Sequence, residues 1–185
     1  MSVSLVKGQK ISLSKESGGS LTKVVVGLGW DPADDDDDID LDASAILFSE
    51  SRDLIDAVWF GQLQSRDGSI VHTGDNLTGE GDGDDEQIIV NLPSVPGQVK
   101  HIVFVVTSYS GETFEEVENA FCRVVDQGTN RELARYSLSS GGANGGLVIA
   151  RVYRHNDEWK MAAIGEYQSE GETYKDMVGL ATRCI

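Results

Sequence analysis

The 185-residue chain has only two cysteines, Cys122 and Cys184, and three prolines. Two cysteines cannot form the disulfide framework of a small secreted domain, and the two cysteines and three histidines are not spaced as zinc-ligand pairs. Long hydrophobic runs are also lacking, because the longest, residues 102–106, is far too short to cross a bilayer. We therefore expect no transmembrane segment.

Basic residues are scarce, with 15 Lys and Arg against 31 Asp and Glu, which gives a formal net charge of -16 and a pI near 4.4. A field of that sign repels nucleic acid and anionic membrane surfaces and attracts cations. The N-terminal segment has no unbroken apolar core of the kind found in signal peptides. The sequence thus predicts a cytoplasmic protein that binds no nucleic acid.

Short apolar runs rich in Val, Ile and aromatic residues are present throughout and alternate with turn residues. This pattern is typical of an all-β sandwich or barrel, and the length suits one domain over residues 1–185. The 39% hydrophobic content excludes global disorder. We expect strands at residues 11–13, 22–28, 39–48, 57–63, 87–92, 101–108, 121–126, 132–138, 146–154 and 159–167.

Two short helices and one tight turn are also predicted. Thr113 and Glu116 have the spacing of a capping box, which predicts a helix running to Ala120. A second helix is expected over residues 173–180. Residues 155–158 are typical of a hairpin turn between two strands.

The acidic residues are concentrated in two segments. Residues 31–42 contain eight Asp and residues 75–86 contain six acids, so these segments hold fourteen of the 31 acids and none of the 15 bases. Two carboxylates about 4 Å apart repel by about 1 kcal/mol in water and by about 4 kcal/mol near a protein surface. Many such pairs would cost more than the stability of a domain, about 5–15 kcal/mol. The segments therefore either stay extended in water, as a flexible acidic linker would, or close on a cation.

Glycine alternates with acidic residues over residues 79–84, and glycine allows a backbone to turn carbonyl oxygens toward a common centre. An oxygen cage of this kind suits Ca²⁺ first and Mg²⁺ second. An EF-hand is excluded, because a loop counted from Asp75 has Leu77 and Gly79 at its third and fifth positions. Asp40 and Asp42 share one face of a predicted strand, about 7 Å apart, and form either a second wall of the cage or a solvent-exposed face.

Three motifs carry a resemblance to a known family: GLGWD at residues 27–31, DLDAS at 40–44 and HTGDNLTGEGDGDDE at 72–86. They resemble the TerD family of tellurium-resistance and stress-response proteins, and residues 62–72 with 118–123 are most similar to its TerZ branch. The resemblance implies a β-sandwich of two mostly antiparallel sheets with one or two short helices. It also implies binding of Ca²⁺, with two or more ions as the cofactor. Carried over by position, the metal ligands are Asp31, Asp40, Asp42, Asp75, Asn76, Gly79, Gly81, Asp82, Asp84, Asp85 and Glu86.

The function expected from these observations is a calcium-binding stress-response protein that acts as a metal-dependent interaction module and is not an enzyme. Its expected partners are calcium ions and other proteins of the same stress-response system. The alternative is a metal-dependent hydrolase with a two-metal carboxylate site. We further expect His72 at the surface of a strand end, Cys122 buried as a small hydrophobic residue, and Trp30, Trp59 and Trp159 in the core.

Overall fold

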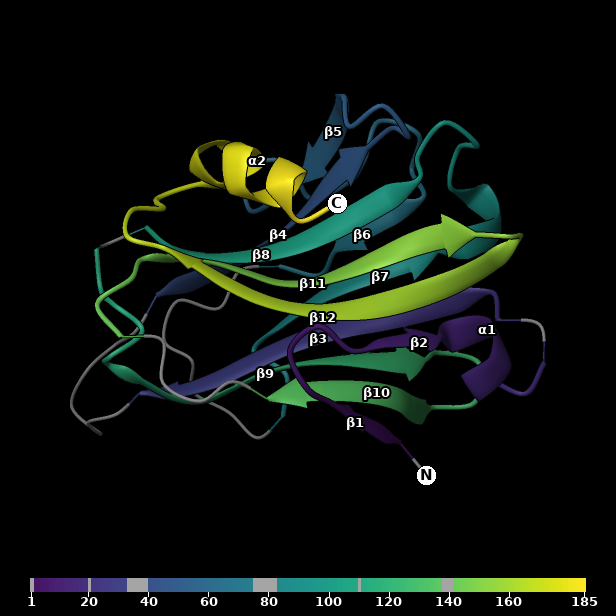
Figure 1. Ribbon diagram of the computed structural model, residues 1–185, viewed down its shortest axis with the longest axis horizontal. Helices are drawn as coiled ribbons and strands as arrows, with labels where there is room; N and C mark the ends of the chain where they lie inside the picture. Colours follow the sequence, from purple (N-terminus) through teal and green to yellow (C-terminus); the bar gives the residue numbers. More distant parts are fainter. Residues whose placement is uncertain (1, 20, 33–39, 75–82, 110, 138–141) are drawn as a thin grey trace.

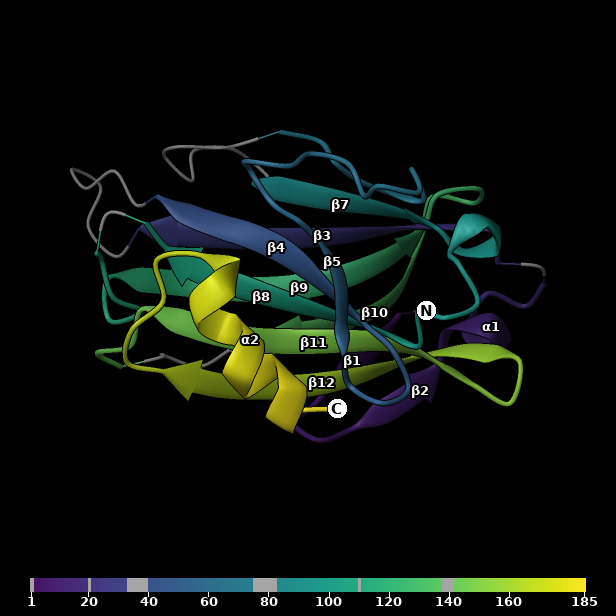
Figure 2. The same ribbon diagram turned by 90° about the horizontal axis from the view of Figure 1, so that it is seen from above.

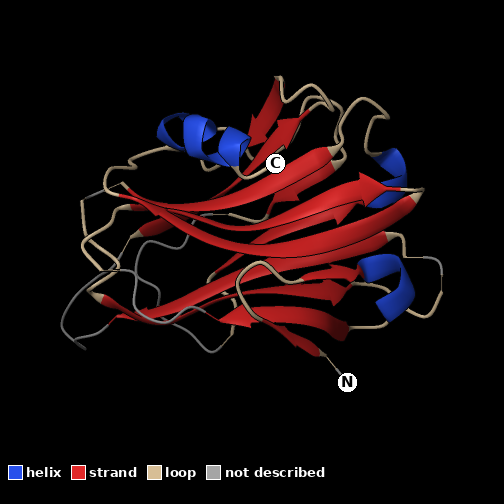
Figure 3. Ribbon diagram, viewed as in Figure 1, coloured by secondary structure: helices blue, strands red, loops and turns tan. Residues whose placement is uncertain are grey.

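The structure is a computed structural model that describes residues 2–19, 21–32, 40–74, 83–109, 111–137 and 142–185. Two six-stranded sheets pack face to face, and strands make up most of the described chain (Figures 1 and 3). The first sheet has the order β1 (Val3–Leu5), β10 (Arg131–Ser137), β9 (Val117–Asp126), β3 (Lys23–Pro32), β7 (Glu86–Asn91) and β6 (Ile70–His72). The second has the order β2 (Lys10–Ser12), β12 (Glu158–Gln168), β11 (Gly146–His155), β8 (His101–Ser108), β4 (Leu41–Phe48) and β5 (Leu54–Val58). Every pairing is antiparallel except that of β1 with β10, so the predicted sandwich is confirmed.

The main core lies between the two sheets, where alternate residues of each strand point inward. In β7 the buried positions are Glu86, Ile88 and Val90, and the residues between them are partly exposed. Strands β4 and β8 are instead buried on both faces, because helix α2 (Tyr174–Arg183) packs on the outer face of the second sheet (Figure 2). This second cluster explains why β4 and β8 have nearly continuous apolar sequences.

Helix α2 confirms one of the two predicted helices. It begins after Thr173, whose backbone N–H donates to Asp176 Oδ2 at 3.0 Å and so caps the first turn. Two further short helices are α1 (Leu13–Glu16) and the 3₁₀ helix η1 (Leu92–Ser94). Among the described residues, every helix is too short or too polar to cross a membrane.

The predicted helix over residues 113–120 is wrong. Thr113 and Glu116 do interact as in a capping box, because the Thr113 N–H donates to Glu116 Oε2 at 2.6 Å, but they close only a turn. From Val117 onward the chain forms β9, which pairs with both β3 and β10. Hydrogen bonds to two neighbouring strands outweigh a local helix-start signal.

The predicted strand at residues 57–63 is also displaced. β5 ends at Val58, and Trp59 and Gln62 then exchange backbone hydrogen bonds of 3.1 and 2.9 Å, which closes a tight turn. The hairpin turn between β11 and β12 is confirmed. Its central residues, Asn156 and Asp157, have φ values of 49° and 59°, as a two-residue hairpin turn requires.

The sandwich has two ends with different character. At the acidic end, on the left in Figure 1, β3 finishes at Pro32, and β4 and β7 begin at Leu41 and Glu86. At the hairpin end, on the right, lie the β4–β5 turn (residues 49–53) and the β11–β12 turn. The predicted metal ligands that the structure describes all belong to the acidic end.

Candidate metal-binding site

The structure describes six of the predicted ligands and places them at the meeting point of three strands. Asp31 is near the end of β3, Asp40 and Asp42 are at the start of β4, and residues 84–86 lead into β7. The other predicted ligands, Asp75, Asn76, Gly79, Gly81 and Asp82, lie outside the described residues, as does the aspartate run 34–38. The six described residues therefore form a group of carboxylates at the ends of three strands, which we call the acidic rim.

Asp85, just before β7, makes two hydrogen bonds to β3. Its backbone N–H donates to Leu28 O at 2.9 Å, and its side-chain Oδ2 accepts from the Trp30 N–H at 2.8 Å. Burial raises the pKa of Asp85 to about 6, and the neighbouring charges of Asp31, Asp84 and Glu86 add to the rise, while the Trp30 hydrogen bond opposes it. Negative charge is therefore crowded here, and a bound cation would relieve the crowding.

Glu86 joins the two sheets. Its side chain is fully buried, and Oε2 accepts from the Ala43 N–H of β4 at 2.6 Å. The same oxygen lies 3.2 Å from His72 Nε2 at the end of β6. Since His72 Nδ1 accepts from the Gly74 N–H at 3.1 Å, the ring proton of the neutral imidazole lies on Nε2 and points at Glu86 and at Ala43 O. The prediction that His72 is a surface residue is wrong, because its side chain is buried inside this network.

Asp84 is held by a cation that no motif in the sequence predicted. Arg123 of β9 donates from Nε to Asp84 Oδ1 at 2.7 Å and from Nη2 to Oδ2 at 3.1 Å, and the Asp84 side chain is only 1% exposed. Hydrogen bonding to Asp84 raises the pKa of Arg123, so the guanidinium stays charged. Arg123 thus neutralises one of the carboxylates of the acidic rim.

Gly27 and Gly29 make room for this arrangement in the middle of β3. A Cβ atom on Gly27 would overlap the Asp84 carboxylate, and one on Gly29 would overlap the Phe121 ring. A glycine inside a strand often marks the close approach of another group. Two glycines alternating within a Val- and Leu-rich strand were therefore the signal that could have located the Asp84 contact.

Asp31, Asp40 and Asp42 complete the described rim. The exposed Asp31 accepts from Asn119 Nδ2 at 2.8 Å, beside an irregularity in the β3–β9 pairing between Gly29 and Asp31. Asp42 faces away from the sandwich core, as the alternation predicts, but it is only 3% exposed and lies opposite the buried Thr107 of β8. The solvent-exposed alternative is thus excluded for Asp42.

Within the described ranges, no group of three or more His, Cys, Asp or Glu residues is arranged to hold a metal ion. The complete ligand set stays a prediction, because five of its eleven members lie outside those ranges. The other predicted roles have clear outcomes. Cys122 is fully buried with its pKa raised to about 12 by burial, and Trp30 and Trp159 are in the core. Trp59 is only partly buried and contacts the Phe60 ring edge-on and the Tyr174 ring at a tilt.

The fold and this rim define a class of protein: an all-β sandwich with the ends of three strands gathered into an acidic edge. The chain belongs to the TerD family, because the TerD domain matches residues 1–178. It is 49% identical to the tellurium resistance protein TerZ of Serratia marcescens, over 95% of this chain and 94% of that protein. It is also 46% identical to general stress protein 16U of Bacillus subtilis (strain 168), over 89% and 90% of the two chains.

Solved structures share the fold. A homologue of the telluride resistance protein TerD from Streptomyces coelicolor A3(2) matches with a TM-score of 0.69 over 86% of this chain and 96% of its own. A second structure, of the protein SAV2460 of unknown function, also has a TM-score of 0.69, over 84% and 94%. At 21% and 22% identity these structures support the sandwich architecture alone.

Proposed function

We propose that this chain is a calcium-binding stress-response protein in which Ca²⁺ orders the acidic end and makes it an interaction module. The observation that carries the proposal is the gathering of Asp31, Asp84, Asp85 and Glu86 at the acidic end, where burial raises the pKa of Asp85 to about 6 and the three neighbouring charges add to the rise. Carboxylate and carbonyl oxygens are the donors that Ca²⁺ prefers. The relatives are named as resistance and stress proteins, which supports the stress-response part of the proposal.

The described contacts divide the acidic residues by role. Asp84 is bound by Arg123, and Glu86 is bound by Ala43 and His72, so we assign these two carboxylates to positioning the strand ends. We assign direct contact with Ca²⁺ to Asp31, Asp40, Asp42 and Asp85, together with oxygens from residues 75–82. When bound, Ca²⁺ would supply positive charge and link the first sheet to the second through their acidic edges.

A calcium titration of the melting temperature tests the proposal on metal-stripped protein. A ligand present at 100 times its Kd and binding only the folded state adds about 2.7 kcal/mol of stability. For a chain of this size that corresponds to a rise of roughly 5–10 °C. A melting temperature that does not change up to millimolar Ca²⁺ would rule out the calcium site.

Matched variants locate the site. Replacing both Asp40 and Asp42 with Asn removes two charges from the rim, and we expect it to abolish most of the calcium-dependent rise. Replacing Asp53 and Asp157 with Asn removes the same charge at the hairpin end and should leave the rise intact. An equal loss in both variants would show that Ca²⁺ responds only to net charge, and isothermal calorimetry would give the number of ions.

A further inference from the structure

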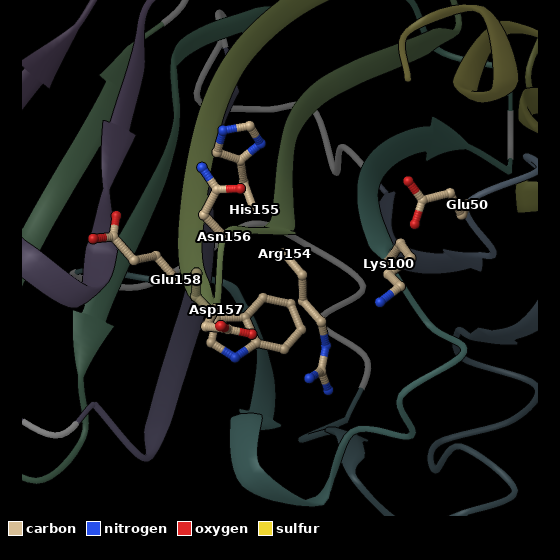
Figure 4. A pocket seen from close by; sticks show the side chains of 8 residues that line it. Glu50, Lys100, Arg154, His155, Asn156, Asp157 and Glu158 are labelled. Atoms are coloured by element: carbon tan, nitrogen blue, oxygen red, sulfur yellow. The ribbon is translucent and has the colours of Figure 1, made fainter.

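A polar pocket of about 370 Å³ lies at the hairpin end, away from the acidic rim. It is formed by the β4–β5 turn, the residue before β8 and the β11–β12 hairpin, and we call it the hairpin pocket. Figure 4 shows Lys100 and Arg154 extending into the same space, while the Asn156 side chain points toward His155. The volume is at the lower limit of small-molecule sites.

Lys100 and Arg154 are neighbours across the sheet. The Arg154 N–H donates to Lys100 O at 3.0 Å, and the Lys100 N–H donates to Phe48 O at 2.9 Å, so the backbone fixes both positions. Like charges on adjacent strands destabilise a sheet unless something between them neutralises the repulsion. Among the described residues, neither cation has a carboxylate within 4 Å, although the chain has 31 acids.

The Arg154 guanidinium is held in advance of any ligand. Nη2 donates to Val95 O at 2.6 Å, and the group lies 4.6 Å from the centre of the Trp159 ring. Its Nε is buried and has no hydrogen-bond partner among the described residues. Glu158 lines the same pocket, but it lies 3.3 Å from Lys15 and points away from Arg154 in Figure 4. A preorganised guanidinium loses little entropy when it binds an oxyanion.

The large negative charge of the protein does not oppose an anion here. Strands of eight to eleven residues, at about 3.3 Å per residue, separate the two ends by roughly 26–36 Å. The Debye length at physiological ionic strength is about 8 Å, so the acidic rim is largely screened at the hairpin pocket. Glu50 and Asp157 also line the pocket and favour a singly charged group over a multiply charged one.

We propose that the hairpin pocket binds the oxyanion group of a small molecule, a carboxylate or a phosphate, between the Lys100 ammonium and the Arg154 guanidinium. The proposal is independent of calcium binding, and its test uses metal-stripped protein, from which the chelator has been removed because chelators are themselves carboxylates.

The test is an NMR titration of the ¹⁵N-labelled chain with inorganic phosphate and, separately, with acetate. Saturable shifts at the backbone amides of Lys100 and residues 154–158 are expected with at least one of the two anions. Saturation by phosphate alone assigns a phosphate ligand, saturation by acetate alone assigns a carboxylate, and saturation by both assigns a general oxyanion site. Shifts that grow linearly with both anions would overturn the proposal.

Charge-matched variants separate a built site from nonspecific attraction. Lys100→Gln should weaken binding about tenfold, because it removes one charge-assisted hydrogen bond. Lys10→Gln, at an exposed position of β2, changes the net charge equally and should leave the affinity unchanged. Glu50→Gln should tighten binding by removing a nearby negative charge. Equal weakening by Lys100→Gln and Lys10→Gln would contradict the proposal, and Lys100→Gln avoids the packing of Arg154 on Trp159.

Discussion

At the acidic end of the sandwich, described carboxylates are bound by backbone N–H groups and by one arginine. At the hairpin end, by contrast, Lys100 just before β8 and Arg154 in β11 lie side by side without a carboxylate partner among the described residues. Trp30, Ala43 and Arg123 provide the contacts at the first end. Lys100 and Arg154 define the second. In both places like charges are brought together by backbone pairing. The difference is that the acidic end buries the side chains of Asp84 and Glu86 inside the fold, while the hairpin end leaves Lys100 and Arg154 facing a pocket.

The largest predicted effect is the loss of stability when Gly27, at the acidic end, is replaced with Ala. In Gly27→Ala the added methyl group would occupy the space of the Asp84 carboxylate and push it away from Arg123. Overpacking combined with disruption of a buried ion pair should cost about 3–5 kcal/mol, or roughly 10 °C in melting temperature. Gly97→Ala is the control, because nothing lies within 4 Å of its added methyl group. Equal melting temperatures for the two variants would contradict the close contact between β3 and Asp84.

The next effect compares a buried ion pair with an exposed one. Arg123→Ala leaves the buried Asp84 carboxylate without its cation, and we expect a loss of about 2–4 kcal/mol, reduced from the fully buried case because Arg123 is 29% exposed. Arg66→Ala removes an 80% exposed arginine that lies 3.6 Å from Asp56, and should cost less than about 1 kcal/mol.

Urea denaturation in a chelator measures both losses. The additional change Asp84→Asn should recover part of the stability of Arg123→Ala, because no unpaired charge then remains. The single variant Asp84→Asn is measured as well. If the double variant loses as much stability as Arg123→Ala and Asp84→Asn lose together, Arg123 stabilises the sheet by packing and not by neutralising Asp84.

Local patterns predicted most of the strands, because alternating burial and turn residues act over a few positions. Residues 101–108 were predicted with the observed bounds. The short strands β1 and β6 were missed, since each has three residues and depends on pairing with a distant partner, β10 or β7. The error at residues 113–120 has the same cause: the capping box is local, whereas the pairing of β9 is not.

The position of the candidate site could be predicted from composition, but the contacts between its residues could not. Clustered acids and alternating glycines located the acidic end, and the alternation of β4 placed Asp40 and Asp42 together. The contact of Arg123 with Asp84 spans 39 positions, and that of Glu86 with Ala43 spans 43, so neither leaves a local pattern. The pairing of Lys100 with Arg154 likewise exists only because β8 and β11 are neighbours.

The smallest predicted effect is the pH dependence of stability that His101 causes at the hairpin end. Burial lowers the pKa of His101 to about 4, and Arg151, Arg52 and Lys100 add to the decrease, while Glu50 opposes it. The ring stacks on Tyr153, at 6.3 Å between centroids. Since the unfolded chain binds this proton near pH 6.5 and the folded chain only near pH 4, the contribution to stability is complete above about pH 6.5 and is lost as the pH falls toward 4.

Replacing His101 with Gln removes this dependence. We expect the stability of the wild-type chain to fall by about 1–3 kcal/mol more than that of His101→Gln between pH 6.5 and pH 4, measured by urea denaturation at each pH. The exposed His155 provides the control, and His155→Gln should retain the wild-type pH profile. Parallel profiles for all three proteins would contradict a lowered pKa of His101. A flattened profile for His101→Gln alone would show that the folded chain disfavours the protonated form of His101, as burial and, to a smaller extent, the neighbouring cations predict.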